Sequence, residues 1–238
     1  MTGEPYMRFA FFLFFHDRQS PAMRITASEE SRVVDLVRST PGLRRGLVFT
    51  PTVASDPYLN DGPSPQLALE LYFDEIASLE NALAPSGHLQ ALAAPNALPS
   101  LTHATVQQQA MLSRPFPVPE PKPVVHANER RCTYLVEYPG QAEDLNAWLW
   151  YYIGHHPELM AKFAGIREIE ICTRIDWCGF LPWPRANVMQ RNKVVFDSPE
   201  ALTASLNSPV RHAMREDFHK FPPFTGGNLH YPMITQEV

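Results

Sequence analysis

The chain has 238 residues, of which 45% are apolar and 19% charged, a composition typical of an ordinary globular protein. A formal charge of −5 excludes the basic surface that a phosphate backbone attracts, so we expect no nucleic-acid partner. The three cysteines show neither C-x-x-C nor Cys/His ligand spacing, which argues against a disulfide framework or a zinc site and favours a cytoplasmic location. The apolar run Phe9–Phe15 is too short to span a bilayer, so we expect no membrane association.

The first half of the chain predicts six elements in order. The apolar, aromatic run is a strand, because it is too short for a helix. Gly42 follows the first helix at the position where a left-handed residue is favoured. The predicted elements are a strand at 9–15, a helix at Ser28–Ser39, a strand after Gly42, a strand at 66–73, a helix after Asp74 and a strand at 101–110.

The second half predicts the same order. A helix from Ala142 to Phe163 carries Leu145, Leu149, Tyr152, His156, Leu159 and Phe163 on one stripe. Ser198-Pro199-Glu200 has the pattern of a helix start, with Ser as N-cap and Pro at the first helical position. The other predicted elements are strands at 132–138, after Gly165, at 188–196 and at 227–234.

The two halves match when the chain is shifted by 123 residues. This shift lays Gly42-Leu43-Arg44 on Gly165-Ile166-Arg167 and Tyr72-Phe73-Asp74 on Val195-Phe196-Asp197. One constant offset over several segments predicts a duplicated unit of about 110–120 residues. The order β-α-β-β-α-β is that of a ferredoxin-like unit.

We therefore predict an α+β protein with two tandem ferredoxin-like units whose antiparallel sheets pack together as an intrachain barrel. The expected boundaries are 1–114 for a degenerate first unit, 115–125 for a connector and 126–238 for the second unit. Proline occupies every second position of 115–123, which indicates an extended spacer; a peptide that docks a partner domain is the alternative.

One motif of the second half resembles a known family. Tyr151, His155 and Pro157, followed by Gly165-Ile166-Arg167, are similar to the EthD-like family of the dimeric α+β barrel superfamily. The family usually has Trp where Tyr151 stands. The resemblance covers about 100 residues, from Arg131 to Met233. It implies a ferredoxin-like unit that pairs into a barrel, and small-molecule chemistry without a dissociable cofactor, often on aromatic or polyketide-like compounds.

His155 and His156 are the first candidate catalytic residues, since an imidazole can take and return a proton near neutral pH. The apolar stripe aims His156 at the sheet, whereas the family resemblance selects His155. The two criteria differ by one residue, and the sequence leaves the choice open. The first half has Arg32 and Val33 at the equivalent positions. A structural role common to both halves therefore explains the two histidines less well than a functional role does.

A long aromatic segment after the second strand of this half is the second candidate. It is rich in Trp, Arg and Asp, with Gly and Pro breaking regular structure, and we expect either a lid at the barrel mouth or a hydrophobic flap. Asp176 is a candidate base or orienting group, and an arginine here is expected to hold a carboxylate or an enolate oxygen. The expected substrate-binding residues are Trp148, Tyr152, Arg174, Trp177, Trp183, Arg185, His230 and Tyr231. The matching loop of the first half, Thr50–Pro65, is expected to flank the entrance.

Other sites are excluded or disfavoured. His212 and His219 are seven residues apart on one helix, about 10 Å of rise, too far for one ion, so no metal is predicted. His230 and Tyr231 alternate in direction on the last strand, so one of them faces the barrel interior. No glycine-rich phosphate loop or catalytic triad order is present, which argues against a nucleotide cofactor and serine hydrolysis.

These observations predict a cofactor-independent acid–base enzyme, an isomerase, cyclase or lyase such as a decarboxylase. Its expected substrate is an aromatic or conjugated hydrophobic small molecule, and its expected role is in catabolism. A haem protein of the chlorite dismutase-like type, with an axial histidine, is the alternative, as is a non-catalytic binding protein. Association of two chains as a homodimer is a further expectation, because this superfamily readily oligomerises.

Overall fold

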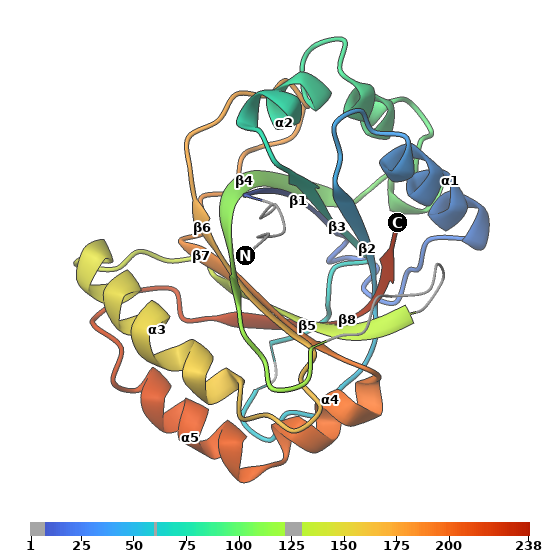
Figure 1. Cartoon of the computed structure of the whole chain (residues 1–238). Helices are drawn as coiled ribbons and strands as arrows, with labels where there is room; N and C mark the ends of the chain where they lie inside the picture. The colour runs from blue at the N-terminus through green and yellow to red at the C-terminus, as the bar shows by residue number, and fades with distance from the viewer. Residues whose placement is uncertain (1–7, 60, 122–129) are drawn as a thin grey trace.

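The computed structural model describes residues 8–59, 61–121 and 130–238. Figure 1 shows eight strands around one centre, with helices outside them. The first half contains β1 (Phe9–His16), α1 (Ala27–Arg38), β2 (Arg45–Pro51), β3 (Leu67–Phe73), α2 (Ile76–Ala82), the 3-10 turns η1 (His88–Ala93) and η2 (Pro99–Leu101), and β4 (Thr105–Phe116). The second half contains β5 (Arg130–Tyr138), α3 (Leu145–Met160), β6 (Glu168–Arg174), β7 (Gln190–Phe196), α4 (Pro199–Leu206), α5 (Pro209–Phe218) and β8 (Leu229–Glu237).

The strands form one closed antiparallel barrel in the order β1-β3-β2-β8-β5-β7-β6-β4. The first half contributes the run β4-β1-β3-β2, and the second contributes β8-β5-β7-β6. Two seams join the halves, β2 with β8 and β4 with β6. The prediction of an α+β fold with sheets closing into a barrel within one chain is therefore confirmed.

The corresponding elements of the two halves keep the spacing seen in the sequence. Arg45, the first residue of β2, and Glu168, the first of β6, are 123 residues apart. Gly42 and Gly165, which precede these strands, have positive φ angles of 78° and 74°. Glycine is favoured at both positions because a Cβ is strained in this region.

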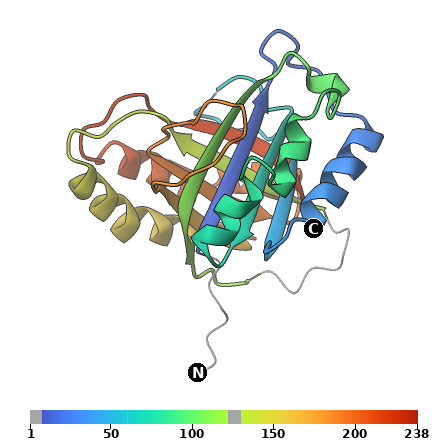
Figure 2. The same cartoon turned by 90° about the horizontal axis from the view of Figure 1, so that it is seen from above.

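The helices cover the two outer faces of the barrel (Figures 1 and 2). Helices α1 and α2 pack on the first-half sheet, and α3, α4 and α5 pack on the second-half sheet. Strand β1 is apolar along its length because both of its faces are buried: Phe11 and Phe15 face the helices, whereas Phe12 and Phe14 face the barrel interior.

Local signals set the helix starts. At α1, the Thr26 side chain accepts from the Glu29 amide, and the Glu29 carboxylate accepts from the Thr26 amide, which is a capping box. At α3, Asp144 accepts from the amides of Asn146 and Ala147. Helix α3 presents Trp148, Tyr152 and His156 to the core.

Three boundaries differ from the sequence prediction. The single helix expected after Asp197 is two helices, α4 and α5, which meet at Asn207 and Ser208. The last strand of the first half, expected at 101–110, runs from Thr105 to Phe116, because Pro115 and Phe116 pair with β6. The expected connector therefore begins inside a strand, and its residues 122–125 lie outside the described residues.

Candidate active site

A cavity of about 80 Å³ lies between the outer face of the second-half sheet and helices α3 and α5. Its walls are mainly apolar, and Leu59 from the segment between β2 and β3 closes one side. The apolar lining includes Val136, Met160, Phe163, Val194, Met214 and Phe218. A more open hollow of about 350 Å³ adjoins it and shares Leu59, Tyr134 and His230 with it.

His156 of α3 lines this cavity and is paired with Asp217 of α5. The distance from His156 Nδ1 to Asp217 Oδ2 is 2.8 Å, and only 6% and 9% of the two side chains are exposed. The Tyr151 hydroxyl donates to the other oxygen of Asp217 at 2.9 Å. The carboxylate is thus held from two directions, and it fixes the imidazole ring in turn.

The pKa values of this pair favour a neutral base next to an ionised carboxylate. Burial lowers the pKa of His156, and the hydrogen bond and charge of Asp217 offset this only in part. Burial alone would raise the pKa of Asp217, but hydrogen bonds from His156 and Tyr151 hold it below its usual range. A neutral His156 therefore donates its Nδ1 proton to Asp217, which leaves Nε2 as the proton acceptor. Among the described residues no hydrogen bond reaches Nε2.

A second polar group sits deeper in the cavity. The Asn192 amide donates to the Tyr152 hydroxyl, and Tyr138 lies beside Tyr152 with ring centroids 5.5 Å apart. Burial raises the pKa of Tyr138 to about 12 and that of Tyr152 well above its ordinary value. Both phenols are therefore neutral, and since Tyr152 donates its proton to Tyr138, the Tyr138 hydroxyl is the one able to donate to a ligand oxygen. Trp148 stacks on Tyr152 at 5.1 Å and supports this wall from behind.

Residues 52–59 and 61–66 of the first half lie beside the cavity, and Leu59 lines it. Asp61 accepts from His230 Nδ1 at 2.8 Å, and Asp56 accepts from Arg211 Nε at 2.9 Å. Burial lowers the pKa of His230, with Asp61 opposing this. These two contacts hold the described part of the first-half loop against β8 and α5 of the second half.

The aromatic segment 175–189 belongs to the second half but packs on the first half, just as the loop between β2 and β3 belongs to the first half and packs on the second. Trp177 meets Phe11 and Trp183 meets Phe15, each with ring centroids 5.5 Å apart. The segment therefore does not cover the second-half cavity; it completes the core under α2, next to β1 and β4 (Figure 2). A lid at this cavity was the wrong expectation, and the flap alternative is nearer to the observed packing.

The predicted site residues therefore divide into separate groups. His156, Tyr152 and His230 line the cavity, and Trp148 lies directly behind it. His155 is exposed and stacks on Tyr151, with Nδ1 2.8 Å from the Tyr151 carbonyl oxygen. The residues Arg174, Asp176, Trp177 and Arg185 line a different hollow of about 520 Å³, and Trp183 packs in the first-half core.

Tyr231 faces the barrel interior, where its hydroxyl donates to Glu137 at 3.2 Å, whereas His230 faces the cavity. The predicted alternation along the last strand is thus observed. His212 and His219 are both exposed on the outer side of α5.

The sequence reasoning missed several cavity residues, including Asp217, Asn192, Arg211 and Arg215. A signal was present on α5: Arg211, Met214, Arg215 and Phe218 follow the spacing of one helix face, and all four line the cavity.

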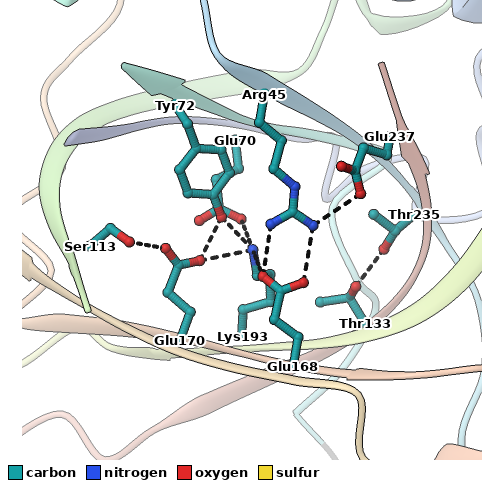
Figure 3. Close-up of polar contacts among 10 residues, drawn as sticks. All are labelled: Arg45, Glu70, Tyr72, Ser113, Thr133, Glu168, Glu170, Lys193, Thr235 and Glu237. Carbon is teal, nitrogen blue, oxygen red and sulfur yellow. Dashed lines mark hydrogen bonds and ion pairs between the residues drawn. The ribbon is translucent and has the colours of Figure 1, made fainter. Parts of the chain in front are cut away.

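A second cluster of charged residues lies inside the barrel (Figure 3). Lys193 Nζ is 2.9 Å from Glu168, 2.8 Å from Glu170 and 3.4 Å from Glu70, and its side chain is 2% exposed. Arg45 of β2 binds Glu168 of β6 through both terminal nitrogens, at 2.9 and 3.0 Å. The cluster joins side chains of both halves across the interior.

This interior cluster acts as a structural tie. Lys193, Glu70 and Glu170 line neither the cavity beside His156 nor its adjoining hollow. Oxygen and sulfur atoms of Glu70, Glu170 and Cys172 lie within 4.8 Å of one another, a spacing that suits a metal ion. The Lys193 ammonium already contacts both carboxyl groups, at 3.4 and 2.8 Å, so we assign no metal here.

The fold and the cavity define a class, a closed α+β barrel with an apolar cavity between its sheet and its outer helices. No family profile matches the sequence, and no curated protein does either. Within the described residues, no helix combines the length and apolarity needed to cross a membrane.

Solved structures support this class. An anthrone oxidase-like protein matches with a TM-score of 0.63 at 12% identity, over 98% of this chain and 94% of that chain. A monooxygenase candidate from Fusobacterium nucleatum matches with a TM-score of 0.59 at 9% identity, over 96% and 92%. An EthD family protein from Bacillus halodurans is 24% identical over 44% of this chain and 95% of its own. Its TM-score of 0.34 is too low to show a shared fold. The chain shares the fold of the first two of these structures, a closed α+β barrel within a single chain.

Proposed function

We propose that the protein is a cofactor-independent enzyme that moves a proton on a conjugated aromatic small molecule bound between the second-half sheet and helices α3 and α5. The observation that carries the proposal is the buried His156–Asp217 pair at the wall of an apolar cavity. A neutral imidazole with one nitrogen fixed by a carboxylate is suited to act as a general base.

The proposed mechanism uses three groups of this cavity. His156 Nε2 takes a proton from an acidic carbon or hydroxyl of the substrate, and Asp217 stabilises the imidazolium that forms. The neutral phenol of Tyr138, which accepts a hydrogen bond from Tyr152, donates a hydrogen bond to the oxygen on which negative charge develops. The apolar walls exclude water and strengthen both interactions.

The fate of the resulting anion defines the reaction type. Return of the proton at another atom gives an isomerase or a cyclase, and in a lyase the imidazolium returns it to the carbon whose carboxylate leaves as carbon dioxide. Reaction of the anion with dioxygen is a second candidate, favoured by the oxidase-like and monooxygenase names of two proteins with the same fold. All of these reactions begin with the same proton transfer.

The residues present do not fit a haem. A porphyrin is larger than the cavity of about 80 Å³ and the adjoining hollow of about 350 Å³ allow, whereas a small aromatic compound can extend from the cavity into this hollow. We therefore derive no step through haem. A binding protein without catalysis would retain ligands but show no turnover.

We also propose that the chain arose by duplication of one EthD-like, ferredoxin-like unit. The identical strand order of the halves and the 123-residue spacing of their elements support this. The loop exchange between halves is what two subunits of a paired barrel would make. On this view 1–114 is a copy whose equivalent cavity is filled by Trp177, Leu181 and Trp183.

Deuterium uptake from D2O tests the enzymatic proposal. A suitable carbon acid is the one-ring compound phenylpyruvate. We expect the wild type to accelerate exchange at its acidic carbon, as followed by proton NMR. His156→Gln should reduce that rate by about 10²-fold or more.

His155→Gln is the matched control, because His155 is the exposed neighbour on the same helix. Its exchange rate should stay within about twofold of the wild type. Equal rates in the two variants would rule out His156 as the base. Circular dichroism and the urea midpoint show whether each variant is folded.

A further inference from the structure

Two arginines one helical turn apart on α5 line the cavity, Arg211 and Arg215. Residues four apart share a helix face, so both guanidinium groups approach the cavity from the same wall. The remaining lining of this wall, Met214 and Phe218, is apolar. Solvation alone does not explain why two arginine side chains line an apolar cavity.

Arg211 has a structural partner. Its Nε donates to Asp56 Oδ2 at 2.9 Å, and the same oxygen accepts from the Tyr134 hydroxyl at 3.2 Å. This pair anchors the loop of the first half. Replacement of Arg211 would therefore disturb the loop as well as any ligand contact.

Arg215 has no such partner in the described part of the chain. Its guanidinium makes no hydrogen bond or ion pair with the described residues, although the residue is partly buried and lines the cavity. Its guanidinium carbon lies 5.0 Å from the centroid of the Tyr58 ring. Stacking on a ring uses the flat face of a guanidinium and leaves its N–H edge free for a planar anion.

The carboxylates around the cavity are engaged elsewhere. Asp217 is held by His156 and Tyr151, and Asp61 by the side chain and amide of His230. Asp56 belongs to Arg211. Arg215 is thus the cavity cation for which the described residues supply no counterion.

We infer that Arg215 binds the carboxylate of an aromatic acid whose ring lies in the apolar cavity. The inference rests on the proposed function for its claim that this acid is the substrate, and it names the substrate class. The guanidinium edge fits a carboxylate through two parallel N–H···O bonds, and the stacked Tyr58 ring holds that edge in place. The ring of the acid then lies against Met214 and Phe218, towards His156.

Benzoate and benzamide form a matched pair of probes, since they share a ring and differ in charge. Ligand-observed NMR gives both dissociation constants for the full-length protein. We expect the wild type to prefer benzoate by about tenfold or more, as a charge-assisted bidentate contact predicts. Arg215→Gln should abolish the preference while leaving benzamide binding intact, which also shows that the cavity is folded.

Two further variants sharpen the test. Arg215→Lys keeps the charge but loses the planar edge, so it should retain only part of the preference. Arg32→Gln, at an exposed arginine on α1, should retain all of it. Equal binding of the two probes by the wild type, absence of benzoate binding, or a preference that survives Arg215→Gln would each overturn the inference.

These outcomes are independent of the deuterium experiment. His156→Gln should lose proton exchange and keep the benzoate preference, because His156 is not the anion-binding group. A benzoate preference without any exchange activity would refute the proposed function and leave the carboxylate site standing. Exchange activity without a benzoate preference would refute the carboxylate site and leave the proposed function standing.

Discussion

Replacing Lys193 by Met is the sharpest perturbation of the barrel interior. Lys193 is 2% exposed and contacts Glu168, Glu170 and Glu70 within 3.4 Å, besides donating to the Tyr72 hydroxyl. Methionine has a similar length but no charge. The variant therefore leaves Glu170 with hydroxyl partners alone and Glu168 with Arg45 alone.

Removal of one partner from a buried ion pair costs about 3–5 kcal/mol, because the remaining charge stays desolvated. At a urea dependence of about 2–3 kcal/mol per molar, the unfolding midpoint should fall by about 1–2 M. Glu170→Gln added to Lys193→Met removes one of the stranded charges and should recover part of this loss.

Urea unfolding followed by circular dichroism measures the change. Lys162→Met, at an exposed lysine, is the control and should stay within about 0.5 kcal/mol of the wild type. A Lys193→Met midpoint equal to that of the control would refute the claim that this cluster ties the two sheets together.

Two further predictions follow from burial and cavity shape. Burial raises the pKa of Glu70 to about 8, with Lys193 opposing this, so the folded state holds a proton that the unfolded state releases near pH 4.5. The stability that this proton contributes is complete below about pH 4.5 and is lost as pH rises through about 8, at up to about 1.4 kcal/mol per pH unit. Glu70→Gln should remove this decline, and parallel unfolding curves for variant and wild type from pH 5 to 9 would contradict it. Leu59→Ala should join the cavity of about 80 Å³ to the adjoining hollow of about 350 Å³, since Leu59 lines both. The affinity for the two-ring 2-naphthoate should then rise several-fold relative to benzoate in ligand-observed NMR, and an unchanged ratio would show that Leu59 is not the barrier.

Local signals in the sequence predicted much of the fold. The aromatic run of β1, the two left-handed glycines and the Ser198-Pro199 helix start each act within a few residues, so they can be recognised without the rest of the chain. The same local periodicity placed His156, rather than His155, on the buried face of α3. The family resemblance favoured the other histidine, and the helix geometry was the better guide to direction.

Long-range contacts account for what the sequence did not predict. The loops cross between halves, so Leu59 lines a cavity whose other lining residues run from Tyr134 to His230, and Asp56 binds Arg211 of that cavity. The sequence analysis did not predict the Lys193 cluster. A strand with both faces buried can carry charge only where a partner strand supplies the counterion, as β6 and β7 do for each other.

The central claim is that His156 is a neutral base held by Asp217, with its second nitrogen available to a ligand. Histidine-selective nitrogen NMR, recorded as a pH titration, tests this claim most directly because it reports both the tautomer and the pKa of each ring. We predict that His156 carries its proton on Nδ1 at pH 7 and becomes charged only below its ordinary pKa, since burial disfavours the imidazolium. A charged His156 at pH 7, or a neutral ring protonated on Nε2, would contradict the account.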